Sequence, residues 1–321
     1  MNSPENICAL ALDVGGTNIR LAVVDQSGHI IARQQCNTSL SHIHASSDDQ
    51  AETEILRILT SSIADILASH SHIHVIGVGF PGFFRQETGI LVSSPNIPCL
   101  LDFPLAERLS DAVSLPVHVQ NDATLAALGE FRFGIGRELK NLLHLTLGTG
   151  VGGGLILNGI PYLGENGMAV EIGHSCVVPN GRACGCGGSG CLETYASASG
   201  IVARYIETGH QDASNAEDVY RKALDGDMVA ERILHEAGIY LGQAIAEAVK
   251  LLDVHNVSIS GGLTGAWSFL SEPIRTSLNE KLIPPLKGKV RLHRSRLGDD
   301  TGLLGAAILA LENGFRPVYV F

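Results

Sequence analysis

Two segments of the chain share one pattern: an apolar strand, a glycine-rich turn, a second apolar strand and a closing turn. Residues 10–28 read LALDVGGTNIRLAVVDQSG, and residues 143–159 read LHLTLGTGVGGGLILNG. Apolar runs bounded by turn residues predict strands, and a short glycine turn between two of them predicts a hairpin. The repetition predicts an internal duplication, in which each half of the chain opens with a β-hairpin whose loop is rich in glycine.

The rest of the chain alternates between strand and helix patterns, which predicts an α/β fold. A length of 321 residues corresponds to about two domains. No low-complexity linker separates the halves, so we expect a packed hinge near residue 120. Buried strands are predicted at 29–34, 75–79, 117–119 and 256–260, and helices at 51–68, 105–113, 227–252 and 301–312.

The composition excludes several classes of protein. Apolar residues make up 45% of the chain and charged residues 17%, which excludes a disordered chain. A net charge of −11 lacks the basic footprint of nucleic-acid binding. No apolar stretch approaches the roughly 18 residues of a membrane span, and residues 1–12 carry no basic group. We therefore expect a cytoplasmic protein with neither a nucleic-acid nor a membrane partner.

The first glycine turn contains residue types that suit a phosphate group. The motif Asp13-Val14-Gly15-Gly16-Thr17 leaves backbone N–H groups free to approach phosphate oxygens, and the Thr17 hydroxyl adds a donor. Asp13, at the end of its strand, can orient a hydrated Mg²⁺ ion. A plain hairpin turn explains the same residues equally well, so both interpretations stay open at this point.

The second glycine turn formally matches the dinucleotide-binding pattern G-x-G-x-x-G over residues 148–153, and Glu171 lies about twenty residues further on. That fingerprint must open a helix, whereas residues 153–159 predict a strand and a turn. A second turn that faces phosphate, paired with the first, fits better. No G-x-x-x-x-G-K-[ST] motif occurs, so a P-loop enzyme is excluded.

Asn121 and Asp122 follow a short apolar run and open a predicted helix. A carboxylate at the end of a strand, beside a cleft, is a typical general base. Aspartate is also an ordinary N-cap residue. From position alone, the N-cap interpretation of Asp122 is favoured over the catalytic one.

The cysteines predict a metal site. Three of the seven lie close together, and Cys184, Cys186 and Cys191 form with His174 a Cys₃His set of tetrahedral zinc ligands. No position stays open for water, so we expect one structural Zn²⁺. Cys176 is the alternative to His174 as fourth ligand. Three free thiols are disfavoured, because a loop this short and rich in glycine cannot bury them by packing.

Taken together, these motifs resemble the ROK family (repressor, open reading frame, kinase), in particular its bacterial glucokinase-type sugar kinases. DVGGT, Asn-Asp before a helix, LGTGVGGG, Glu-Ile-Gly-His and CGCGGSGCLE occur in this order along essentially the whole chain. The resemblance implies two ribonuclease-H-like α/β domains of the actin and hexokinase superfamily around a cleft, with a zinc loop. It implies a small domain over 1–120, joined by a C-terminal helix over 305–321, and a large domain over 121–304.

The resemblance also implies roles for individual residues. Asp122 would be the catalytic base, and His174 would use one ring nitrogen for zinc and the other for the sugar. The sugar would be bound by Gly82, Asn96, Asn121, Asp122, Glu171, His174 and Glu193. ATP with Mg²⁺ would be bound by Asp13, Gly15, Gly16, Thr17, Asn18, Gly148, Thr149, Gly150, Gly261 and Gly262.

The activity implied is that of an ATP-dependent hexokinase of carbohydrate metabolism and glycolysis, which phosphorylates the 6-hydroxyl of a hexose, with glucose as the expected acceptor. The resemblance also implies a homo-oligomer, a dimer. An N-acetylmannosamine or N-acetylglucosamine kinase is the alternative. Val170 replaces a glycine that the family usually has directly before Glu171 and adds bulk beside the sugar, so the resemblance does not fix which sugar is bound. Ser260 replaces the first of the three glycines that the family usually has in the adenosine turn.

The alternative from another class is a non-catalytic, sugar-sensing ROK protein. Repressors of the family carry a winged helix before the DxGGT loop, and the twelve residues before Asp13 are expected to be too few for one. A sensor need not keep Asp13, Asp122 and both glycine turns, so their presence favours an enzyme.

Overall fold

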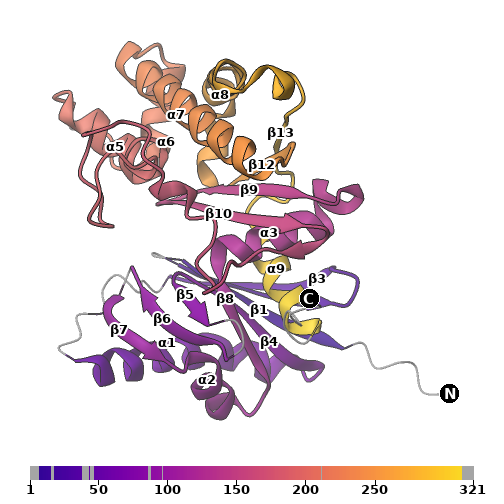
Figure 1. Cartoon of the computed structure of the whole chain (residues 1–321). Coiled ribbons are helices and arrows are strands. Elements are labelled where there is room, and N and C mark those ends of the chain that lie inside the picture. Colours follow the sequence, from indigo (N-terminus) through magenta and orange to yellow (C-terminus); the bar gives the residue numbers. More distant parts are fainter. Residues whose placement is uncertain are drawn as a thin grey trace. The chain divides into compact units, whose positions relative to one another are not determined.

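The computed structural model describes residues 7–15, 18–37, 43, 47–85, 88–95, 97–210 and 212–312 (Figure 1). The chain divides into two compact units. The first comprises Met1–Phe133, Pro161–Ala169 and Asp300–Phe321, and the second comprises Gly134–Ile160 and Val170–Asp299. Among the described residues, no helix has both the length and the apolar character that crossing a membrane requires.

The first unit contains a five-stranded sheet in the order β3-β2-β1-β4-β8. β1 and β2 form the predicted hairpin, β3 adds an antiparallel strand beside β2, and β4 and β8 continue the sheet in parallel. A smaller antiparallel sheet has the order β5-β6-β7. The strands are β1 (Cys8–Val14), β2 (Ile19–Asp25), β3 (Ile30–Cys36), β4 (Ile73–Phe80), β5 (Phe83–Arg85), β6 (Ile90–Ser94), β7 (Ile97–Phe103) and β8 (Val117–Asn121).

Helices cover both faces of the large sheet, and β1 is accordingly buried along its whole length. One face of β1 shares an apolar core with α1. On the other face, Ala9 and Ala11 have small side chains, and α9 packs against β1 and β4 there. At Gly77 of β4, a Cβ atom would lie 1.9 Å from the Ala306 carbonyl oxygen. The helices are α1 (Asp48–Ser69), α2 (Leu105–Val113), α3 (Asp122–Phe133) and α9 (Asp300–Leu311).

α3 and α9 are in backbone contact through two glycines. A Cβ atom at Gly129 would lie 2.0 Å from the Thr301 carbonyl oxygen, and one at Gly305 would lie 1.8 Å from the Leu125 carbonyl oxygen. Because any side chain at either position would separate the backbones, only glycine permits this approach. The contact anchors α3, and with it Asp122 at its start, in the first unit.

The division of the chain differs from the predicted one for this reason. The first unit extends through α3 to Phe133 instead of ending at residue 120, and the chain returns to it at Asp300 instead of 305. Pro161–Ala169 also belongs to this unit, where a Cβ atom at Gly167 would lie 2.2 Å from the Phe84 carbonyl oxygen. Residues 313–321, within the predicted C-terminal helix, lie outside the described residues.

The second unit repeats the plan of the first. Its sheet has the order β11-β10-β9-β12-β13, in which an antiparallel hairpin is followed by parallel strands beside its first strand. When the strands of each sheet are counted in chain order, both sheets have the order 3-2-1-4-5, as an internal duplication predicts. The strands are β9 (Leu142–Leu147), β10 (Val151–Leu157), β11 (Ile160–Pro161), β12 (Asn256–Ser260) and β13 (Arg291–Arg294).

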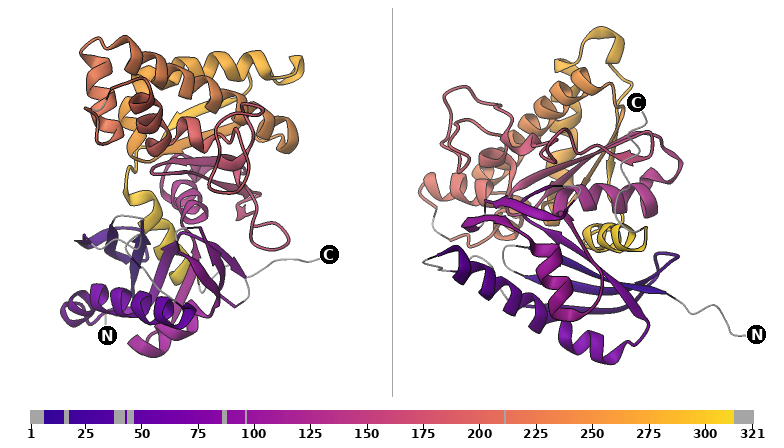
Figure 2. Two further views of the ribbon diagram at one scale, coloured as in Figure 1. Left: turned by 90° about the vertical axis from the view of Figure 1, so that its left-hand side faces the viewer. Right: turned by 60° about the horizontal axis from the view of Figure 1, so that its bottom comes forward.

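The helices of the second unit pack into one apolar core with β9, β10 and β12 (Figure 2). α7 and α8 form the most extensive helix pair of this unit. The helices are α4 (Glu193–Ala196), α5 (Ala198–Glu207), α6 (Ala216–Leu224), α7 (Met228–Leu252) and α8 (Trp267–Lys281), with short 3₁₀ turns η2 (Ile135–Glu138), η3 (Ile172–His174), η4 (Gly262–Ala266) and η5 (Pro284–Leu286).

One polar side chain lies at the centre of this sheet. His144 on β9 is fully buried, its Nδ1 lies 2.6 Å from Ser258 Oγ, and its Nε2 lies 2.9 Å from Ser260 Oγ. Burial lowers the pKa of His144 to about 3, so the imidazole is neutral at physiological pH. One ring nitrogen therefore donates a hydrogen bond and the other accepts one, and the two serine hydroxyls take complementary roles.

Replacing His144 with glutamine is expected to flatten the pH dependence of stability. The imidazole pKa is about 3 in the fold and near 6.5 in the unfolded chain, so between these values the unfolded chain binds the extra proton. The free energy of unfolding therefore falls as pH falls from 6.5, by up to about 1.4 kcal/mol per pH unit. Glutamine binds no proton. Denaturant titrations at pH 7, 6 and 5 measure the free energy of unfolding of both proteins. If that free energy changes with pH to the same extent in the wild type and the variant, the prediction is wrong.

Candidate active site and metal centre

In the first unit, the β1–β2 turn presents Asp13 at the end of β1. The strand register pairs Asp13 with Arg20, whose guanidinium donates a 2.8 Å hydrogen bond to Asp13 Oδ2. Gly15 N–H donates to the Asn18 carbonyl oxygen at 2.9 Å and closes the turn. Gly16 and Thr17 lie outside the described residues. A single carboxylate is a suitable protein ligand for Mg²⁺, which keeps waters and substrate phosphates as its other ligands.

The Asn121-Asp122 pair lies where β8 ends and α3 begins. Asn121 Oδ1 accepts a 3.0 Å hydrogen bond from Thr124 N–H, which is the N-cap bond of α3. Asp122 is instead the first residue of the helix, and its Oδ1 accepts a 2.8 Å bond from Ala123 N–H. The N-cap role that position alone favours for Asp122 therefore belongs to Asn121.

Gly82 lies beside this pair. Asn121 Nδ2 donates a 3.2 Å hydrogen bond to the Gly82 carbonyl oxygen. A Cβ atom at Gly82 would lie 2.4 Å from Leu91 Cδ1 and 2.8 Å from the Ser93 carbonyl oxygen, so the β4–β5 turn packs tightly on β6. Gly82, Asn121 and Asp122 are thus brought together at one edge of the sheet, while Asn96 lies outside the described residues.

In the second unit, the glycine turn between β9 and β10 holds a carboxylate. Gly148 N–H donates to the Gly150 carbonyl oxygen at 3.0 Å, and β10 begins at Val151. The turn therefore opens a strand, which excludes the dinucleotide fingerprint. Glu193 Oε2 accepts a 3.0 Å bond from Val151 N–H, and a Cβ atom at Gly150 would lie 2.3 Å from that oxygen.

The same turn is tied to the start of α5. Ala198 N–H donates to the Gly148 carbonyl oxygen at 2.9 Å, and Ser199 Oγ donates to the Thr149 carbonyl oxygen at 2.6 Å. The residues expected to hold phosphate thus contact a residue expected to bind the sugar, Glu193. The sequence carried a local signal for each group but none for the contact between them.

The Gly261-Gly262 turn lies next to this loop. Gly261 has a φ of +93°, and a Cβ atom there would lie 2.3 Å from the carbonyl oxygen of Leu147, the residue before Gly148. A positive φ and this close approach both require glycine. η4 begins at Gly262, where an added Cβ atom would meet nothing within 4 Å. Both predicted nucleotide turns of the second unit therefore start at adjacent strand ends.

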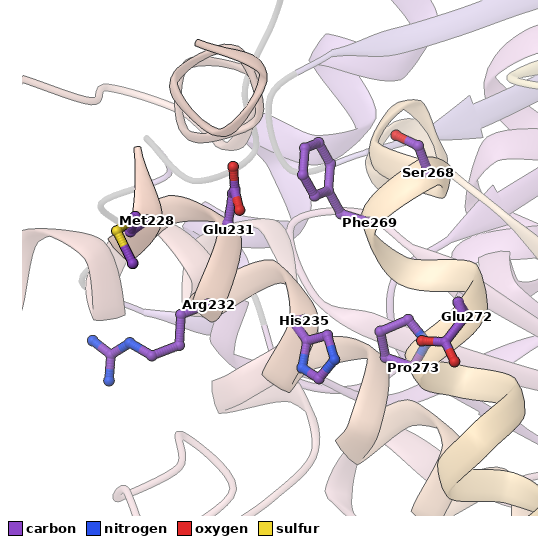
Figure 3. A pocket seen from close by; sticks show the side chains of 8 residues that line it. All are labelled: Met228, Glu231, Arg232, His235, Ser268, Phe269, Glu272 and Pro273. Carbon is purple, nitrogen blue, oxygen red and sulfur yellow. The ribbon is translucent and has the colours of Figure 1, made fainter. Parts of the chain in front are cut away.

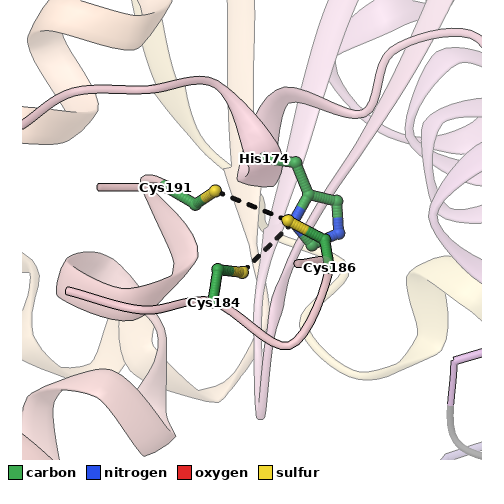
Figure 4. Close-up of side chains that lie close together, drawn as sticks. All are labelled: His174, Cys184, Cys186 and Cys191. Atoms are coloured by element: carbon green, nitrogen blue, oxygen red, sulfur yellow. Dashed lines mark hydrogen bonds between the residues drawn. The ribbon is translucent and has the colours of Figure 1, made fainter. Parts of the chain in front are cut away.

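The side chains of His174, Cys184, Cys186 and Cys191 converge on one point (Figure 4). One ligand atom from each lies within 4.8 Å of the others. Cys186 Sγ lies 3.7 Å from Cys191 Sγ, and Cys184 Sγ lies 3.7 Å from His174 Nδ1. Zinc–sulfur bonds of about 2.3 Å place tetrahedral sulfur ligands about 3.8 Å apart, so this spacing fits zinc.

A tight turn at a glycine of the loop brings the cysteines of this cluster together. Gly187 has a φ of +88°, and its N–H donates to the Cys184 carbonyl oxygen at 3.0 Å. Cys191 is only 3% exposed, contrary to the expectation that such a loop buries no thiol. Burial, with the neighbouring thiols, raises the pKa of Cys191 to about 12. A metal ion would therefore displace its proton on binding. Exposed Cys176 is not part of the group.

Glu171 lies against the metal cluster. His174 Nδ1 is directed to Cys184, while its Nε2 lies 3.9 Å from Glu171 Oε2. Burial raises the pKa of Glu171, and the negative charge of Glu193 raises it further, whereas His174 lowers it. Glu171, His174 and Glu193 are thus electrostatically coupled at the base of the metal loop.

A separate pocket of about 390 Å³ lies on the second unit between α7 and α8 (Figure 3). None of the predicted site residues lines it, so it is not the candidate active site. Its lining consists of Met228, Glu231, Arg232, His235, Ser268, Phe269, Glu272 and Pro273.

The chain is similar to known sugar kinases along nearly its whole length. A glucokinase of Halalkalibacterium halodurans is 37% identical, with 94% of each chain covered. An N-acetylmannosamine kinase of Escherichia coli O1:K1 is 31% identical over 94% of this chain and 97% of the relative. The crystal structure of a ROK family glucokinase from Streptomyces griseus, in complex with glucose and AMPPNP, has a TM-score of 0.83 at 30% identity, covering 95% of this chain and 99% of that one.

The repeated α/β plan agrees with this likeness. The ROK family model matches residues 9–313, which include both glycine turns, the Asn-Asp pair and the metal cluster. With this match and relatives above 30% identity, the chain belongs to the ROK family.

Proposed function

We propose that this chain is an ATP-dependent hexose kinase that transfers the γ-phosphoryl group to the 6-hydroxyl of glucose. The observation that carries the proposal is that Asn121 and Asp122 have different roles at the start of α3. Asn121 supplies the N-cap bond, so the helix does not require Asp122 for that purpose. A carboxylate fixed at the end of a strand and not needed as a cap is suited to act as a general base.

In this scheme, Asp122 accepts the proton of the 6-hydroxyl as that oxygen attacks the γ-phosphorus in line. Backbone N–H groups of the two glycine turns stabilise the charge on the transferred group. Mg²⁺, which would be held by Asp13 and the phosphate oxygens, would neutralise part of that charge. Gly261 and Gly262 would contact the adenosine.

The sugar hydroxyls would be bound by Gly82, Asn96 and Asn121 of the first unit and by Glu171, His174 and Glu193 of the second. The four metal ligands fit one Zn²⁺, which would fix His174 and supply no chemistry of its own. Its role is structural, because the site leaves no ligand position for water.

An N-acetylmannosamine kinase is the second candidate, and a specific observation favours it. Val170 has a φ of +69°, which is unusual for a β-branched residue, and it directly precedes Glu171. A residue larger than the usual glycine therefore directly precedes a predicted sugar ligand in the chain, and its side chain packs against the apolar core of the second unit. An N-acetylmannosamine kinase is also among the relatives at 31% identity.

A panel of hexoses and N-acetylhexosamines with ATP, in a coupled assay for ADP, tests the proposal. We expect turnover with glucose to exceed that with N-acetylmannosamine, and 6-deoxyglucose to inhibit competitively without being phosphorylated, because it lacks the attacking oxygen. Phosphorylation of the 6-deoxy sugar would contradict the assigned regiochemistry. Preference for N-acetylmannosamine would favour the second candidate, and sugar binding without turnover would favour a sensor.

Two further expectations of the family resemblance stay predictions, namely a homodimer in solution and a cytoplasmic location. Light scattering of the purified full chain tests the first directly.

A further inference from the structure

Ser260 connects the buried histidine to the glycine turn. It is the last residue of β12 and directly precedes Gly261, where the backbone takes a φ of +93°. Its hydroxyl lies 2.9 Å from His144 Nε2, and the side chain is buried, with 3% of the residue exposed. The hydrogen bond to His144 therefore depends on this hydroxyl.

The bond crosses between two strands just before both turns. β12 runs parallel to β9, with Ser258 opposite His144 and Ser260 opposite Thr146. From Thr146, the chain passes through Leu147 into the Gly148 turn. The His144 imidazole therefore ties the end of β12 to the strand that leads into the other nucleotide turn.

The start of the Gly261 turn lies against β9, where a Cβ atom at Gly261 would lie 2.3 Å from the Leu147 carbonyl oxygen, whereas the next residue has open space around it. Glycine adopts a wide range of backbone conformations, and an added Cβ atom at Gly262 would meet nothing within 4 Å. Within the turn, Thr264 N–H donates to the Gly261 carbonyl oxygen at 3.0 Å. The side chain before the turn is thus well placed to determine where the turn begins.

We propose that Ser260, through its hydrogen bond to His144, is a positioning residue that holds the Gly261-Gly262 turn in the conformation that binds the adenosine of the phosphoryl donor. This inference rests on the proposed function, which assigns adenosine to that turn. Ser258 bonds the other nitrogen of the same imidazole but lies two residues further from the turn. Loss of either hydroxyl leaves a buried ring nitrogen without its partner, so both serines support stability.

The test compares Ser260→Ala with Ser258→Ala in the full chain. Ser260→Ala is expected to raise the KM for ATP, and the Kd for a non-hydrolysable ATP analogue, by about 5- to 30-fold. The KM for the hexose is expected to stay unchanged. Ser258→Ala is expected to lower the melting temperature to a similar extent without changing either nucleotide constant. Ser260→Thr, which keeps a hydroxyl, is expected to recover nucleotide affinity.

Equal effects of the two alanine variants on ATP, or no effect of either, would overturn the positioning role. Calorimetry with the ATP analogue separates this outcome from failure of the proposed function. If the wild-type chain phosphorylates no sugar, the proposed function fails, yet weaker binding of the analogue to Ser260→Ala alone still supports the inference. If the wild type is active and both variants bind the analogue equally, only the inference fails.

Discussion

Replacing Asp122 with asparagine is expected to lower kcat by about 10²- to 10⁴-fold while the sugar and ATP still bind. Asparagine matches the shape of aspartate and keeps an oxygen to accept the bond from Ala123 N–H, but it does not act as a base. Because Asn121 provides the N-cap bond, the melting temperature is expected to change little. Steady-state kinetics, calorimetric binding of both ligands and thermal unfolding together measure these effects.

Asp300 offers a matched control for this experiment. It is likewise the first residue of a helix in the same unit, and its carboxylate accepts hydrogen bonds from Arg33. Asp300→Asn is expected to leave kcat unchanged, because that carboxylate is not assigned to the reaction. Near-normal kcat in Asp122→Asn, together with a lower melting temperature, would return Asp122 to a purely helix-initiating role.

The features that could be predicted from the sequence are those that depend on residues close together in the chain. The duplicated hairpins have an apolar run on each side of a glycine turn, and the structure repeats one strand order in both units. The metal cluster takes three of its members from one short loop. In both cases, neighbouring residues are also neighbours in space, so local patterns suffice.

The boundary between the units could not be predicted in the same way. It depends on Gly129 and Gly305, which allow α3 and α9 to touch although they lie far apart in the sequence. A glycine inside a helix signals close approach only when its partner is known. Local patterns place the four helices predicted at 51–68, 105–113, 227–252 and 301–312 close to α1, α2, α7 and α9, and leave the unit of each undetermined.

The site was incompletely predicted for a related reason. Asn121 and Asp122 are both good N-cap residues, and only the bond to Thr124 N–H distinguishes them. The contact between Glu193 and Val151 joins two motifs that the sequence keeps apart. For the buried network, a signal was present: His144 interrupts an apolar strand, and Ser258 and Ser260 alternate on one face of another.

The metal cluster has structural support on both sides. Arg182 N–H donates to Tyr195 Oη at 2.9 Å, and Gly190 N–H donates to the Arg182 carbonyl oxygen at 2.7 Å. Leu192 and Tyr195 belong to the apolar core of the second unit. Residues 184–188, by contrast, contribute no side chain to that core. Loss of the metal is therefore expected to release residues 184–188 while the unit stays folded.

The purified chain is expected to contain one Zn²⁺, and Cys184→Ala or chelation is expected to weaken sugar binding by about 10- to 100-fold, with little effect on an ATP analogue. The reason is the placement of His174, whose Nδ1 faces the thiols while its Nε2 lies 3.9 Å from Glu171 Oε2. Without the ion, the ring loses the partner that fixes its orientation. Metal analysis, calorimetry with each ligand and amide hydrogen exchange at Gly187 and Gly188 measure these effects.

Cys176→Ala is the matched control for the metal site. The backbone of Cys176 pairs with that of Cys191 in an isolated β-bridge, but its thiol is not one of the four predicted ligands. It is expected to retain zinc and sugar affinity. If Cys176→Ala loses the ion while His174→Ala keeps it, Cys176 replaces His174 as fourth ligand. If Cys184→Ala weakens ATP binding and leaves sugar binding intact, the metal loop supports the glycine turn through Glu193 instead, because that carboxylate is bonded to Val151 N–H.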